Sequence, residues 1–208
     1  MRSSTAAVRA MTSSLKLLFR GRRATTGDGD AQTIIQSPLN EPAWVSGILG
    51  EGAPADAWHG RYFALPADAR PALTPFFDPG FYRDANPDVA SAGVDPYLHF
   101  LAHGLAEGRW PHPLIDVGFM RRQLAHDGTD ALLDARRLAG LLRDNSVAPH
   151  PMFDVGYYLD RYRDVADSGT SALLHFITHG AEEGRTPHSG FDPDAQSDDE
   201  PCEEALRT

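Results

Sequence analysis

The length of 208 residues allows one or two domains, and the formal net charge of −10 makes the chain acidic overall. An acidic surface repels nucleic acid, so general DNA or RNA binding is excluded as the expected function. The single cysteine, Cys202, cannot form an internal disulfide, and no stretch reaches the roughly 18 apolar residues of a membrane span.

The amino-terminal segment is basic, unlike the rest of the chain. Residues 1–27 contain six basic side chains and no acidic one, and a short apolar run at residues 15–19 is interrupted by Lys16. This run is too short and too charged for an ordinary secretory signal. The composition is typical of disorder, so we expect residues 1–36 to be a flexible basic segment. A transit peptide or a membrane-surface helix is the alternative interpretation.

The main pattern of the chain is a repeat with a period of 38 residues. An apolar residue followed by aspartate marks it, at Phe77-Asp78, Ile115-Asp116, Phe153-Asp154 and Phe191-Asp192. A Pro-His pair recurs with the same spacing, at Pro111-His112, Pro149-His150 and Pro187-His188. A fixed period of this length is typical of arrays of small supersecondary units, which bury their apolar faces against one another.

The period predicts three units, which we number unit 1 (75–112), unit 2 (113–150) and unit 3 (151–188). Residues 37–74 keep only traces of the pattern, such as Leu39-Asn40 in the expected place, and we interpret them as a degenerate capping unit. Residues 189–208 are acidic and poor in apolar side chains, which predicts a disordered tail.

The units contain the start and stop signals of short helices. Asp78 followed by Pro79 is a favourable N-cap and first helical residue. Later in the unit, apolar residues 97, 100 and 101 have the spacing of an amphipathic helix. We predict helix caps at Asp78, Asp116, Asp154, Gly104 and Gly180. Each unit is therefore two or three short helices with an extended return, and the predicted fold class is all-α.

Unit 2 diverges from its neighbours. It keeps the apolar-Asp start and the Pro-His end but loses most of the residues between them. Arg137 and Leu141 stand where units 1 and 3 have histidines. Its segment 130–144 has the clearest amphipathic helical pattern of the three units.

The recurring residues resemble a known repeat, found in tandem in bacterial glycosyltransferases and in rhamnan-synthesis-type polysaccharide proteins. Similar units accompany some secreted calcium-binding repeat proteins. In unit 1 the likeness is carried by Phe77-Asp78, Asn86-Pro87-Asp88-Val89, His99-Phe100, His103-Gly104 and Glu107-Gly108-Arg109. In unit 3 it is carried by Phe153-Asp154, Asp164-Val165-Ala166, His175-Phe176, His179-Gly180 and Glu183-Gly184-Arg185. The resemblance implies an accessory segment of surface-polysaccharide machinery. It does not extend to a nucleotide-sugar-binding α/β domain, because the sequence shows no alternation of strands and helices.

Two histidine pairs are the candidate metal ligands. His99 and His103 are four residues apart, as are His175 and His179, so each pair lies on one face of a helix and could share a zinc ion. Neither pair has the glutamate of a zinc-protease motif, and no third ligand is evident. We therefore expect the pairs to be structural, with the second histidine placed favourably at a helix C-terminus.

The Glu-Gly-Arg sequences are the candidate binding residues. Arg109 with Glu107, and Arg185 with Glu183, could grip a carboxylate or phosphate. The favoured alternative is that the arginine reaches the capping aspartate of the same or the next unit, because a residue repeated in an array usually serves the array itself.

The recurring aromatic side chains could form a platform for sugar rings. Tyr82 and Tyr158 are the first candidates, and the others are Tyr97, Trp110, Tyr157 and Tyr162. Aromatic residues at helical spacing more often belong to the core, so we expect most of them to be buried.

No catalytic residue is assigned, because the sequence has no nucleophile elbow, phosphate loop or calcium loop. We expect a non-catalytic interaction or scaffold module of bacterial surface-polysaccharide synthesis, with no cofactor. The expected partner is a protein such as a glycosyltransferase, and a glycan is a further candidate. Two alternatives stay open: part of a glycosyltransferase whose catalytic domain is elsewhere, and a secreted module that binds carbohydrate or a cation. The expected location is the cytoplasm, with peripheral contact at the inner membrane surface as a variant of it.

Overall fold

The computed structural model describes residues 28–49, 57–126 and 133–190. These residues form short helices joined by turns, and no β-strand occurs among them. Within the same ranges, the strand-like pairs are two isolated antiparallel bridges, His112 to Ile115 and His150 to Phe153. The predicted all-α fold class is confirmed. In this part of the chain, no helix is both long and apolar enough to cross a membrane.

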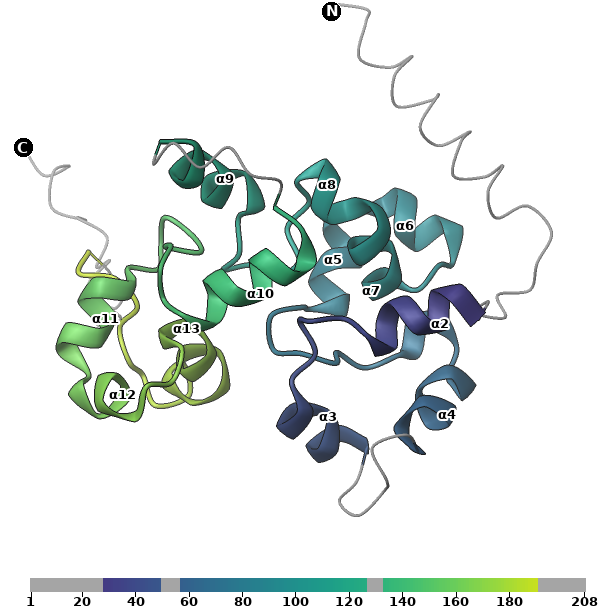
Figure 1. The fold of residues 1–208 in the computed structure, drawn as a ribbon, viewed down its shortest axis with the longest axis horizontal. Coiled ribbons are helices and arrows are strands. Elements are labelled where there is room, and N and C mark those ends of the chain that lie inside the picture. Colours follow the sequence, from purple (N-terminus) through teal and green to yellow (C-terminus); the bar gives the residue numbers. More distant parts are fainter. Residues whose placement is uncertain (1–27, 50–56, 127–132, 191–208) are drawn as a thin grey trace, which may run out of the picture.

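The helices follow one another in short steps along the chain (Figure 1). Before unit 1 come α2 (Asp28–Ile35), α3 (Pro42–Leu49), α4 (Ala57–Ala64) and the 3-10 turn η1 (Ala67–Ala69). Unit 1 holds α5 (Pro79–Ala85), α6 (Pro87–Ala92), α7 (Pro96–His99), the π-helical turn η2 (Phe100–Gly104) and α8 (Leu105–Glu107). Unit 2 holds α9 (Val117–His126) and α10 (Ala135–Arg143). Unit 3 holds α11 (Val155–Arg161), α12 (Arg163–Ser168), α13 (Ala172–His175) and the π-helical turn η3 (Phe176–Gly180). Figure 1 shows α10 between the helices of unit 1 and those of unit 3.

Helix α2 corrects the predicted extent of the flexible segment. Residues 28–35 are helical, and Ile34 is fully buried. The Asn40 side-chain amide donates to the carbonyls of Ile34 and Ile35 in the last turn of this helix. The prediction was wrong here because one buried isoleucine hardly changes the polar composition of the segment. Residues 1–27 and 191–208, which include the rest of both predicted tails, lie outside the described residues.

The segment 37–74 brings its two ends together. The Glu41 backbone N–H donates to the Leu73 carbonyl at 3.3 Å, and the Trp44 indole N–H donates to the Ala72 carbonyl at 3.1 Å. These contacts close a loop that contains α3 and α4. The loop also supplies core residues, because Leu39, Val45 and Leu73 are buried.

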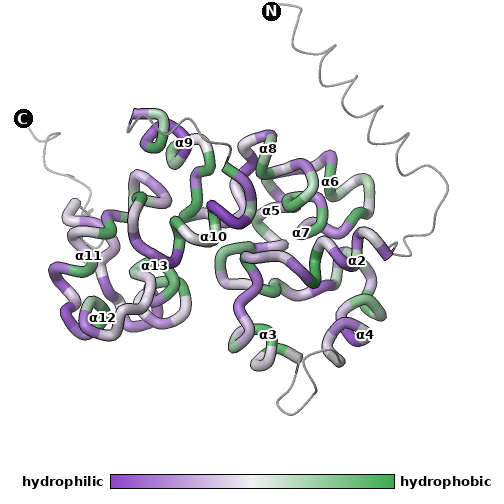
Figure 2. The backbone as a smooth tube through the Cα atoms, viewed as in Figure 1, coloured by the Kyte–Doolittle hydropathy of each residue, from purple (hydrophilic) through white to green (hydrophobic). Residues whose placement is uncertain are grey.

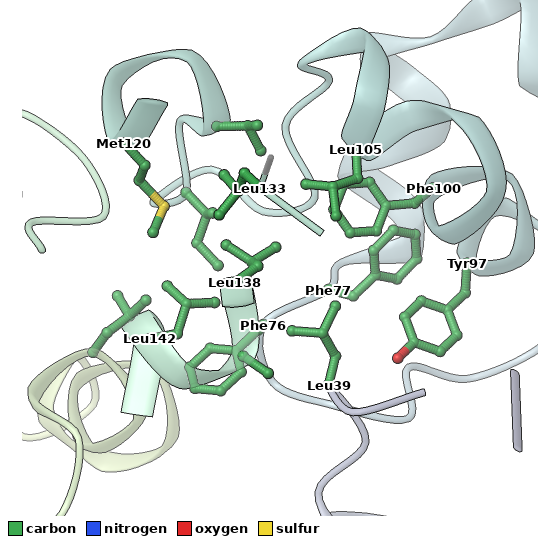
Figure 3. Packing of buried hydrophobic residues seen from close by; sticks show 14 of the residues in the cluster. Leu39, Phe76, Phe77, Tyr97, Phe100, Leu105, Met120, Leu133, Leu138 and Leu142 are labelled. Atoms are coloured by element: carbon green, nitrogen blue, oxygen red, sulfur yellow. The ribbon is translucent and has the colours of Figure 1, made fainter. Parts of the chain in front are cut away.

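One hydrophobic cluster runs through all these segments (Figure 3). Phe77 lies at the centre of its unit 1 part, with its ring centroid 5.0 Å from that of Tyr97, 5.2 Å from Tyr82 and 5.7 Å from Phe100. Burying each such side chain contributes about 1.5–3 kcal/mol. Apolar residues occur in short patches along the described parts of the chain, and residues from before unit 1 and from all three units join the cluster (Figure 2).

The start of each unit is tied to its end by a backbone hydrogen bond. The Asp78 N–H donates to the Pro111 carbonyl at 2.8 Å, Asp116 to Pro149 at 2.9 Å, and Asp154 to Pro187 at 3.0 Å. The side chains of the same three aspartates accept hydrogen bonds from backbone N–H groups of the following helix. Each aspartate therefore fixes both the first turn of a helix and the closure of its segment.

Gly104 and Gly180 do not have the predicted role of a left-handed helix end. Gly104 keeps right-handed helical angles, and the chain continues into α8. At this end of each unit the residues with a left-handed backbone are Gly108 and Gly184, with φ of 76° and 67°. The earlier glycines are needed for space, because a Cβ at Gly104 or Gly180 would overlap the hydroxyl of Tyr82 or Tyr158. The sequence spacing could not distinguish a glycine required for a left-handed backbone from a glycine required because a side chain would not fit.

Unit 2 has different residues at the two positions of this tyrosine–glycine contact. Met120 and Leu142 take the places of the tyrosine and the glycine, and both are buried. Helix α10 begins after the N-cap Asp134 and has no π-helical turn. A π-helical turn contains one residue more than the α-helical turn it replaces. Helices α7 and α13, which lead into such turns, accordingly start one repeat position earlier than α10.

Candidate functional site

The recurring charged residues of units 1 and 3 form a cluster with the same geometry in both. In unit 1 the Arg109 Nε donates to Glu107 at 2.6 Å, and its two terminal nitrogens each donate to Asp88 at 2.9 Å. One of them also donates to the Asn86 side chain at 2.8 Å. Arg109 thus binds an aspartate of its own unit. The aspartate that it binds is Asp88, which lies in the first turn of α6. The sequence favoured a capping aspartate such as Asp78 instead.

Arg185 repeats this arrangement at the corresponding place in unit 3. It donates to Glu183 at 2.6 Å and to Asp164 at 3.0 and 2.8 Å. Tyr162 replaces Asn86, and the guanidinium carbon lies 4.8 Å from the centre of its ring. Both arginine side chains therefore bind partners within their own unit.

The two clusters differ in exposure. The Asp88 side chain is 24% exposed, whereas that of Asp164 is 61% exposed. In both, the hydrogen bonds from the arginine lower the pKa of the aspartate below its ordinary value of 3.8. The unit 1 cluster is the more shielded of the two, so its ion pair is screened less by water.

A tyrosine and a histidine form the second recurring contact. The Tyr82 hydroxyl lies 3.0 Å from His99 Nδ1, and the Tyr158 hydroxyl lies 2.9 Å from His175 Nδ1. Burial raises the pKa of Tyr82, and it raises the pKa of Tyr158 to about 12. Burial also lowers the pKa of His99 to about 4, and it lowers the pKa of His175. At neutral pH both pairs are therefore uncharged.

The histidine pairs have the proximity that their spacing predicts. The ring centroids are 5.5 Å apart for His99 and His103, and 5.7 Å apart for His175 and His179. The first ring of each pair, however, directs Nδ1 to a tyrosine, and His179 Nδ1 is 2.7 Å from the Thr178 hydroxyl. Across the described ranges, no group of three or more His, Cys, Asp or Glu residues could hold a metal ion.

Three of the tyrosines proposed as a sugar platform are buried, whereas Tyr157 and Tyr162 are partly exposed. Tyr82 and Tyr158 have no exposed surface, and Tyr97 is 2% exposed. The expected burial is confirmed for these three. Tyr82 and Tyr158 are therefore not exposed to a ligand, as their assignment as candidate binding residues required. Trp110 differs, because it is 37% exposed and its ring meets that of His150 edge-on at 5.3 Å.

A buried ion pair was missed by the sequence analysis. Arg70 donates to Asp95 at 2.7 Å, and the two side chains are 4% and 3% exposed. The Tyr62 hydroxyl donates to the same Asp95 oxygen at 3.3 Å. The second carboxylate oxygen of Asp95 caps α7. The Asp95-Pro96 dipeptide indicated a cap, but no signal pointed to Arg70, which belongs to the degenerate segment.

Two arginines of unit 2 link it to other segments. Arg121 donates to the carbonyls of Leu105 and Ala106 near the end of α8. Arg143 donates to the Glu41 carboxylate at 2.8 Å, across 102 positions of the chain. The Arg121 contact has an equivalent in unit 1, where Arg83 donates to the Asp68 carbonyl. The Arg143 contact has none, because Leu105 and Ala181 stand at the corresponding positions of units 1 and 3.

Comparison of the chain with family models, with curated proteins and with solved structures found no match.

Proposed function

We propose that the chain is a non-catalytic helical-repeat module that binds a protein partner in bacterial surface-polysaccharide synthesis. It is built as an array of three units of 38 residues, with residues 37–74 as a degenerate cap at one end. The sequence resemblance supplies the biological context. The contacts that recur at this spacing in a helical fold support the architecture.

One observation carries the non-catalytic part of the proposal: the recurring polar residues bind one another. Arg109 and Arg185 each engage a glutamate and an aspartate, and His99 and His175 each engage a tyrosine. A catalytic group must face a substrate, whereas these groups face neighbours in their own unit. Their recurrence therefore favours a role in shaping the unit.

The proposed partner is a glycosyltransferase. Arrays of small units present extended surfaces, and such surfaces commonly serve protein binding. The same context fits a chain that belongs to a glycosyltransferase whose catalytic domain is elsewhere. We place the proposed site of action in the cytoplasm, at or near the inner membrane surface.

The test combines an activity assay with a binding assay on the full chain. Purified protein is incubated with a panel of nucleotide-sugars, and released nucleotide is measured. We expect no release above the protein-free blank. We also expect the chain to co-purify with a glycosyltransferase and to bind it after separate purification. The Arg122→Ala variant, which changes an exposed side chain outside both clusters, serves as the matched control for the cluster variant Arg185→Ala.

Turnover that scales with the amount of protein, and that is lost in Arg185→Ala but kept in Arg122→Ala, would overturn the non-catalytic assignment. Failure of the purified pair to bind would overturn the proposed partner.

A sugar-binding role is the second candidate, and the partial exposure of Trp110 favours it. An exposed indole ring can stack on a sugar face. Titration with surface oligosaccharides should then change the tryptophan fluorescence, and the change should be lost in Trp110→Ala. An unchanged signal in the wild type excludes this candidate.

A further inference from the structure

A histidine turn closes each of the three units. The Nδ1 atoms of His112, His150 and His188 accept hydrogen bonds from the backbone N–H two residues later, in Leu114 at 3.1 Å, Met152 at 3.0 Å and Gly190 at 2.9 Å. An imidazole nitrogen can accept only while it carries no proton. Each turn therefore requires the neutral ring with its hydrogen on Nε2.

These turns lie where one unit passes into the next. On one side of His112, the Pro111 carbonyl accepts the closing hydrogen bond from Asp78; on the other, the His112 carbonyl accepts from the Ile115 N–H at 3.0 Å. The second turn repeats this order with Pro149, His150 and Phe153. The Nδ1 hydrogen bond and the two backbone hydrogen bonds together fix the path of the chain from one unit to the next.

The charged groups that face these rings are known. The Asp78 carboxylate acts electrostatically to raise the pKa of His112, and the Asp116 carboxylate, 3.8 Å from the Arg122 guanidinium, acts to raise the pKa of His150. Both carboxylates favour the protonated ring, but burial outweighs them. Burial lowers the pKa of His112 to about 4 and lowers the pKa of His150 below 6.5. At neutral pH the rings are uncharged acceptors.

We propose that His112 and His150 form acid-sensitive hinges between the units. Protonation of Nδ1 replaces its acceptor lone pair with an N–H group, which then faces the backbone N–H of Leu114 or Met152. Two donors repel, so the turn opens. The helices keep their aspartate caps and their apolar contacts, so opening changes the relation between units before it changes helix content. The role of the chain in binding a partner does not enter this inference.

Asparagine provides a matched control, because its side-chain oxygen is attached to the same Cγ position as Nδ1. It accepts a hydrogen bond from the N–H two residues later and has no proton to gain in this pH range. His112→Asn/His150→Asn should therefore keep the turns and remove their pH response. His112→Ala/His150→Ala should lose the turns at every pH.

The experiment follows amide hydrogen exchange at Leu114 and Met152 in the full chain between pH 7 and pH 4, corrected for the intrinsic pH dependence of exchange. In the wild type we expect protection to fall about tenfold at these amides, as the loss of one hydrogen bond implies. Far-UV circular dichroism should stay constant over the range in which protection is lost. The asparagine variant should keep its protection.

Three results would overturn the proposal: protection that persists to pH 4 in the wild type, an equal loss in the asparagine variant, or helix content that falls together with the protection. If the double variant does not fold, the single variant His150→Asn gives the same comparison, because the Leu114 amide then reports an unchanged turn and the Met152 amide a changed one.

Discussion

Tyr82 and Gly104 share one space: the tyrosine hydroxyl occupies the position where a side chain at residue 104 would begin. The same holds for Tyr158 and Gly180, and unit 2 replaces both partners together, with Met120 and Leu142. Residue size at one position is therefore set by residue size at the other.

Gly104→Ala should destabilise the protein by about 1–3 kcal/mol, because the added methyl group overpacks a buried contact. Gly140→Ala is the control, since a Cβ there meets nothing within 4 Å, and it should stabilise α10 by about 0.5–1 kcal/mol. Urea denaturation measures both. Adding Tyr82→Phe should reduce the loss at residue 104 below the sum of the single effects. A purely additive result would show that the hydroxyl does not limit this space.

The buried pair of Arg70 and Asp95 should be more sensitive to neutralisation than any exposed pair. Asp95→Asn keeps an oxygen to cap α7 but removes the charge beside the buried guanidinium, and we expect a loss of about 3–5 kcal/mol. Asp160→Asn, in a pair that is 70% and 76% exposed, should change stability by less than about 1 kcal/mol. Thermal and denaturant unfolding compare the two. Equal effects would contradict the structural importance of the buried pair.

His99 makes stability depend on pH in a defined direction. Burial lowers its folded pKa to about 4 from 6.5, so the unfolded chain binds more protons between these values. The stabilisation by neutral His99 is complete above about pH 6.5, declines as the pH falls, and is lost below about pH 4; it is on the order of 2–3 kcal/mol. His99→Gln should flatten this part of the curve of unfolding free energy against pH. The exposed neighbour His103, changed to Gln, should leave the slope in place.

The two arginine clusters should differ in strength and share their pH response. Asp88→Asn should cost about 1–2 kcal/mol, and the more exposed Asp164→Asn should destabilise the protein less than Asp88→Asn does. Both aspartates have a folded pKa below 3.8, so their contribution is present above that pH and is lost as the pH falls through the lower folded value. Denaturation of each variant at pH 7 and pH 3 measures this. A larger effect at Asp164 would contradict the ordering by exposure.

Local signals in the sequence predicted the parts of this fold that depend on neighbouring residues. The aspartate caps follow from Asp-Pro and Asp-Val-Gly sequences, because a cap needs only its own first turn. The helical character follows from apolar spacing. The choice of a buried tyrosine over a ligand platform needed the tertiary structure, since Tyr82 has the same local spacing in either case.

Contacts between distant segments could not be predicted. Arg109 was expected to bind the capping aspartate of its own or the next unit, but it binds Asp88 in the first turn of α6, a choice that depends on the tertiary arrangement. The Arg143–Glu41 contact joins unit 2 to the segment 37–74. Neither keeps enough of the repeat pattern to predict a contact between them. Gly104 was assigned a backbone role, because the ring that excludes a side chain there lies on another helix.

The closing hydrogen bonds have a consequence for the order of folding. Asp78 and Pro111 are only 33 positions apart, so a segment can close as soon as its own residues have left the ribosome. The contact between Arg143 and Glu41 must wait for more than a hundred residues. We therefore expect each segment to form early and on its own, and the arginine link to form last. Weakening that late link should then speed unfolding while leaving the folding rate almost unchanged.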